Sequence, residues 1–141
     1  MKNTLTIIIL FLSSFIGYSQ ENKSKLQLAD GYHDQAVNIL TNNGDLNKAL
    51  DYINKAILNN PKNANGFYIK GNIIERTNGF ASALQIYLKV LTINPKHIDA
   101  TSKVAVCYGK LNNKTKFCIY AKKACDLGSI EACNMTERFC N

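Results

Sequence analysis

The chain has 141 residues, a formal net charge of +7 at neutral pH, 46% hydrophobic residues and 19% charged residues. This length suits one domain with a modest core, and the ordinary composition excludes a disordered or collagen-like chain. The excess of lysine suits an acidic partner. The lysines are dispersed, however, and no platform of aromatic and basic residues indicates nucleic acid, which we therefore do not expect as a partner.

The first 19 residues have the layout of a secretory signal peptide. Lys2 precedes an apolar run at 5–16, and small residues occupy the −3 and −1 positions of a cut before Gln20. The run is shorter than the roughly 20 apolar residues that a transmembrane helix needs. We expect cleavage and no stable membrane span, with a retained signal anchor as the alternative. The cleavage region resembles that of exported bacterial proteins, which predicts a periplasmic or secreted mature chain of residues 20–141.

Two Asn-Pro pairs, Asn60-Pro61 and Asn94-Pro95, lie 34 residues apart. The same offset aligns Ala49 with Ala83, and a fixed period of this size is typical of helical repeats. Each period reads as two amphipathic helices separated by polar turns. The sequence predicts an all-α solenoid of about three helical hairpins, at about 30–61, 64–95 and 98–129, followed by a capping helix at about 130–140.

The second hairpin contains the stretch GFYIKGNIIERTNGFASALQIYLKVLTINP, with a succession of a large residue, a glycine, a bulky residue, an alanine, a second bulky residue and a proline. These are Phe67, Gly71, Ile74, Ala83, Tyr87 and Pro95. In this succession the hairpin resembles the tetratricopeptide repeat. Lys70 departs from the pattern, which has leucine there. The resemblance implies a binding module whose concave groove takes a peptide or a partner protein, without a cofactor.

The resemblance also implies which side chains line that groove. The expected partner-binding residues are Asn38, Tyr68, Asn72, Arg76 and Lys110, and their neighbours in the groove are Asn42, Glu75, Ser102 and Val106. An amide can bond a peptide backbone in both directions, and Arg76 and Lys110 can pair with ligand carboxylates. The alternative is that each is an ordinary solvated position.

Basic residues are frequent in the third hairpin, where Lys96, Lys103 and Lys110 recur every seven residues. Such a stripe suits an acidic protein, an acidic glycan or an anionic lipid surface. A merely solvated helix face is the alternative. We expect the partner to be a protein or peptide, with an acidic one as the favoured kind.

Four of the five cysteines lie in the last 24 residues, at Cys118, Cys125, Cys133 and Cys140. Residues seven apart share one face of a helix, and Gly128-Ser129 predicts a turn between two antiparallel helices. Residues equidistant from Ser129 then face each other. This predicts disulfides Cys125–Cys133 and Cys118–Cys140, which persist outside the cytosol.

The segment YAKKACDLGSIEAC also resembles the Sel-like relatives of the tetratricopeptide repeat, whose secreted members carry a disulfide across the spacing C-x7-C. Cys107 is expected to be a buried free thiol, with a bridge to Cys118 as the alternative. A zinc site is the other use of four cysteines, but C-x2-C spacing is absent and we expect no metal.

No catalytic motif occurs in the sequence: there is no phosphate-binding glycine loop, H-E-x-x-H, G-x-S-x-G or S-x-x-K. His33 and His97 are expected to be surface or packing residues. We therefore expect a protein that is not an enzyme and has no catalytic residues. The alternative is a cell-envelope hydrolase or peptidoglycan-binding protein of the cysteine-rich Sel-like kind.

Overall fold

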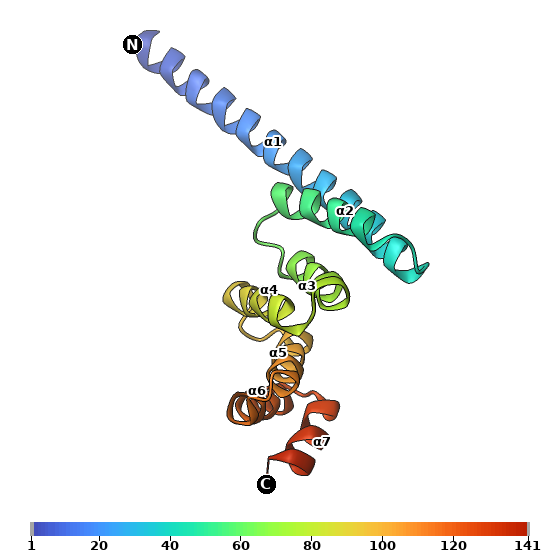
Figure 1. Ribbon diagram of the computed structural model, residues 1–141. Coiled ribbons are helices and arrows are strands. Elements are labelled where there is room, and N and C mark those ends of the chain that lie inside the picture. The colour runs from blue at the N-terminus through green and yellow to red at the C-terminus, as the bar shows by residue number, and fades with distance from the viewer. Residues whose placement is uncertain (1, 141) are drawn as a thin grey trace.

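The computed structural model describes the backbone of residues 2–140 and the side chains of residues 17–140. Helices follow one another through this part of the chain, which contains no strand (Figure 1). They are α1 (Lys2–Thr41), α2 (Leu46–Asn59), α3 (Ala64–Asn78), α4 (Phe80–Ile93), α5 (Ile98–Lys110), α6 (Lys114–Asp126) and α7 (Ile130–Phe139). The all-α fold class expected from the sequence is confirmed.

The helices pack as hairpins in chain order. α1 packs on α2, α3 on α4 and α5 on α6, while α7 packs on α6. The hairpins stack one after another, so α1 and α7 lie at opposite ends of the assembly (Figure 1). This is the solenoid of three hairpins and a capping helix that the 34-residue period predicts.

Polar residues set the helix ends. Asn60 and Asn94 follow the last residues of α2 and α4, and the proline after each cannot continue the helix. Asn63 begins α3, because its side chain accepts a hydrogen bond from the Gly66 amide. The period in the sequence therefore has a local physical cause at each turn.

Small buried residues let the helices approach closely. Ala49 and Ala83, which the 34-residue offset aligns, are both fully buried. Each belongs to a separate apolar cluster, one between α1, α2 and α3 and one between α4 and α5. The core is thus distributed along the stack, as in other repeat folds.

The helix α1 extends well beyond its partner. Ala29 is its first buried residue among the described side chains, and all of residues 17–28 are exposed. The expected signal peptide at 1–19 has most of its side chains outside the described part of the chain and stays a prediction. Among the described residues, no helix combines the length and the apolarity that crossing a membrane requires.

Candidate functional site

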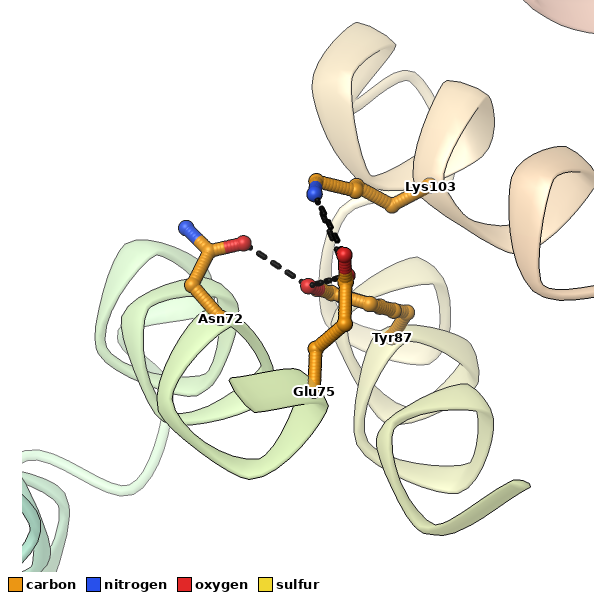
Figure 2. A network of polar contacts seen from close by, with 4 residues as sticks. All are labelled: Asn72, Glu75, Tyr87 and Lys103. Carbon is orange, nitrogen blue, oxygen red and sulfur yellow. Dashed lines mark hydrogen bonds and ion pairs between the residues drawn. The ribbon is translucent and has the colours of Figure 1, made fainter. Parts of the chain in front are cut away.

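A polar network joins the second and third hairpins, and Tyr87 of α4 lies at its centre (Figure 2). The Tyr87 side chain is fully buried, and its ring lies against Gly71 of α3. This contact brings the hydroxyl to 2.7 Å from Oδ1 of Asn72 and 2.7 Å from Oε2 of Glu75. A residue that the sequence pattern assigns to packing therefore also positions two polar side chains of α3.

The Tyr87 hydroxyl has one hydrogen to donate, and the Glu75 carboxylate is the stronger of the two acceptors. The Asn72 amide can turn by 180° and donate from Nδ2 to the same hydroxyl, which satisfies all three groups. Burial and, after it, the hydrogen bond to Glu75 raise the pKa of Tyr87 well above its ordinary value. Tyr87 is thus a neutral donor throughout the physiological pH range.

Glu75 also forms an ion pair across the hairpin boundary. The Nζ of Lys103, on α5, donates to Oε1 at 3.0 Å and to Oε2 at 3.1 Å. The Glu75 side chain is 17% exposed and that of Lys103 is 34% exposed. Water screens such a pair less than it screens one on an open surface, so the pair helps to fix α3 relative to α5.

Cys107 lies in the core beneath this pair and is a buried free thiol, as expected. Burial and, after it, the charge of Glu75 raise the pKa of the Cys107 thiol to about 11, and the charge of Lys103 opposes the shift. The alternative bridge to Cys118 is not formed, because Cys118 is paired with Cys140.

Tyr68 and Asn38, two of the expected groove residues, have different surroundings. The Tyr68 ring lies between those of Tyr87 and His97, with centroid distances of 6.0 Å and 5.1 Å. His97 begins α5, because its Nδ1 accepts a hydrogen bond from the Ala100 amide. Asn38 lies on α1, where the Asn42 side chain donates to its Oδ1, and it takes no part in the network.

Arg76 and Lys110 are both exposed. Arg76 lies in the last turn of α3 and forms no ion pair with any described residue. Lys110 ends α5, with its Nζ 5.8 Å from the centre of the Phe80 ring. Of the five expected partner-binding residues, only Asn72 joins the network directly, and Tyr68 contacts it through the Tyr87 ring.

Two members of the network have roles that sequence reasoning missed. From the sequence, Lys103 was assigned only to the basic stripe and Tyr87 only to helix packing. The sequence signal that could have indicated the ion pair was a carboxylate, Glu75, on the first helix of one hairpin and a lysine, Lys103, on the first helix of the next. That signal becomes a contact only once the packing of α3, α4 and α5 is known.

The C-terminal hairpin brings four cysteines together in the two pairs that the spacing predicts. The sulfurs of Cys118 and Cys140 are 2.10 Å apart, and those of Cys125 and Cys133 are 1.96 Å apart. Ser129 begins α7, since its Oγ accepts from the Ala132 amide. Ala121, Ala124 and Ala132 are fully buried and allow the close approach that disulfides need. Within the described part of the chain, no cluster of histidine, cysteine and carboxylate groups could hold a metal ion.

Comparison with known proteins identifies the repeat. Residues 29–63 match the tetratricopeptide repeat. No curated protein matches the chain by sequence. The chain thus contains a tetratricopeptide repeat, within the first of its three hairpins. The Sel-like resemblance of the C-terminal segment stays an expectation.

Solved structures share the fold at low sequence identity. The crystal structure of MamA is 22% identical with a TM-score of 0.66, and the match covers 70% of this chain but only 57% of MamA. The first TPR of Spaghetti (RPAP3), bound to HSP90 peptide SRMEEVD, is 16% identical with a TM-score of 0.74 over 81% of this chain and 91% of that one. The Arabidopsis OM64 TPR domain is 17% identical with a TM-score of 0.75 over 82% and 96%. The protein therefore has the fold of tetratricopeptide-repeat proteins.

Proposed function

We propose that the protein is an exported, non-catalytic interaction module. Its ligand is a peptide, or an extended segment of a partner protein, that carries acidic residues. It binds along the face formed by α3 and α5, where Asn72 offers an amide and where Lys103 and Arg76 offer cations. The chain's formal net charge of +7 favours the encounter with such a ligand.

The Glu75–Lys103 ion pair is the observation that carries this proposal. Lys103 holds a carboxylate at the boundary between two hairpins, and its side chain is still 34% exposed. An ammonium group has three hydrogens, and both contacts go to the one Glu75 carboxylate, so at least one hydrogen remains for a carboxylate that arrives from solvent. The charge of Glu75 opposes that second carboxylate and limits its affinity.

The structure of the first TPR of Spaghetti (RPAP3) supports an acidic ligand. That domain is bound to the HSP90 peptide SRMEEVD, in which three of the seven side chains are carboxylates. Its match to the present chain covers most of both molecules. The same stack of hairpins can therefore present a face to an acidic peptide.

Two further observations agree with a binding role outside the cytosol. The hydroxyl, carboxylate and ammonium groups of the network bond to one another, and the raised pKa of Tyr87 keeps its hydroxyl protonated, so that no phenolate is present to act as a base. The two cysteine pairs at disulfide distance suit an oxidising compartment.

A peptide selection tests the proposal. The oxidised chain would be immobilised and exposed to a random peptide library, beside the variant Lys103→Ala. The matched control is Lys89→Ala, which removes the same charge from an exposed position on α4. We expect the wild-type chain and the control to select peptides rich in Asp and Glu, and Lys103→Ala to lose that preference. Selection without an acidic preference, or unchanged by Lys103→Ala, would contradict the proposal.

A further inference from the structure

An open hollow of about 600 Å³ lies at the C-terminal end of the stack, among α5, α6 and α7. The network does not extend into it. The residues that matter here are Val106 and Lys110 of α5, Lys114 and Phe117 of α6, and Met135 and Phe139 of α7. Its walls are thus largely apolar, and Phe139 is 52% exposed. An aromatic ring left so open beside a concave apolar surface is typical of a binding site.

The disulfide Cys118–Cys140 holds the aromatic walls of this hollow. Phe117 and Phe139 are each the residue immediately before a cysteine of that bridge. Their ring centroids are 6.2 Å apart in an edge-to-face arrangement, and the two cysteine Cα atoms are 5.5 Å apart. The bridge therefore fixes the end of α7 where Phe139 can face Phe117.

The charge around the hollow has one sign. Lys110 and Lys114 are among its lining residues, and no carboxylate is. The hollow also continues the face of the network, because Lys103, Val106 and Lys110 have the three- and seven-residue spacing that shares one side of a helix. A ligand that reaches Lys103 can thus extend along α5 to this apolar recess.

We infer that the hollow is the anchor subsite for one apolar side chain of the acidic peptide ligand. The side chain lies between Phe117, Phe139 and Met135, while carboxylates on either side of it meet Lys110 and Lys114. The inference rests on the proposed function and adds a specificity to it: the recognised segment has an aromatic or large aliphatic residue flanked by acidic ones. Burial of such a side chain corresponds to about a ten- to hundredfold gain in affinity.

Two labelled peptides of equal charge serve as probes, Glu-Asp-Phe-Asp-Glu and the same peptide with Ser in place of Phe. Fluorescence anisotropy measures their binding to the oxidised full chain. We expect the Phe peptide to bind about ten- to hundredfold more tightly. The variant Phe139→Ala should remove this difference. Its control, Ile130→Ala, changes an exposed apolar residue of α7 that does not line the hollow and should preserve the difference.

The role of the bridge is tested with Cys118→Ala combined with Cys140→Ala. This variant should lose the preference for Phe while it still binds the Ser peptide, and circular dichroism would verify that its helices persist. Equal binding of the two peptides by the wild-type chain would overturn the inference and leave the proposed function standing. Failure of both peptides to bind would overturn the proposed function, and the inference with it.

Discussion

The ring of Tyr87 lies directly against the backbone of Gly71, one helix away. A Cβ atom at position 71 would be 2.7 Å from Cδ1 of Tyr87, closer than real Cβ contacts come. Tyr87 is fully buried and bonded at its hydroxyl, so its ring cannot simply turn aside. The absence of a side chain at Gly71 is therefore what allows Tyr87 to reach Asn72 and Glu75.

Substitution Gly71→Ala should lower the free energy of unfolding by about 1–3 kcal/mol, because the added methyl overpacks the contact with Tyr87. The measurement is urea denaturation followed by circular dichroism. Gly31→Ala is the matched control in α1, where a Cβ would meet nothing within 4 Å. It should raise stability by roughly 0.5–1 kcal/mol through helix propensity. A stabilising effect at Gly71 would show that the contact is looser than described.

Substitution Tyr87→Phe should cost about 1–2 kcal/mol, since it leaves Glu75 and Asn72 without their shared partner in a partly buried site. The control is Tyr108→Phe. The Tyr108 ring packs on Tyr120, but its hydroxyl bonds to no described residue, and its loss should be nearly neutral. Equal denaturation midpoints for the two variants would argue against the network.

The Cys107 thiol should resist alkylation in the folded protein. Its pKa is raised to about 11 by burial, so the reactive thiolate is scarce at pH 8 and becomes appreciable only as the pH rises toward that value. Mass spectrometry after iodoacetamide treatment should find Cys107 unmodified in buffer and modified in guanidinium chloride. Rapid labelling of the native chain would contradict its burial.

The bridge pattern predicts an order of stability losses. Closing the 22-residue separation of Cys118–Cys140 restricts the unfolded chain more than closing the 8-residue separation of Cys125–Cys133. Loss of the first bridge should cost about 3 kcal/mol, and loss of the second somewhat less. Non-reducing peptide mapping checks the pairing itself, and a peptide that links Cys107 to Cys118 would refute it.

Local sequence signals were sufficient to predict the repeat and the turns. Asn60-Pro61 and Asn94-Pro95 each end a helix, and Ser129 begins one. Helix capping and the missing amide hydrogen of proline act over only a few residues, so these signals can be read locally. The cysteine pairs followed from the turn at Ser129, since a hairpin fixes which positions face each other.

The proposed binding face was less predictable, because it depends on how α3, α4 and α5 pack. The sequence predicted Asn72 as a groove residue from its place in the repeat, but its contact with Tyr87 needs the ring to lie against Gly71. Lys103 belongs to a regular stripe in the sequence, yet in the fold it is bonded to Glu75, 28 residues earlier. Glu75 and Lys103 lie on different helices, α3 and α5, so no pattern within one helix predicts the pair, which becomes visible only in three dimensions.

The most direct test of the account is the affinity of one acidic peptide for three forms of the chain. Glu75→Gln retains an oxygen for the Tyr87 hydroxyl but removes the negative charge that competes for Lys103, whereas Lys103→Ala removes the cation. Anisotropy titration with the peptide Glu-Asp-Phe-Asp-Glu should rank Glu75→Gln tightest, the wild-type chain next and Lys103→Ala weakest, with the differences shrinking as salt is added. The same affinity for all three forms would contradict the proposal that this face binds an acidic ligand.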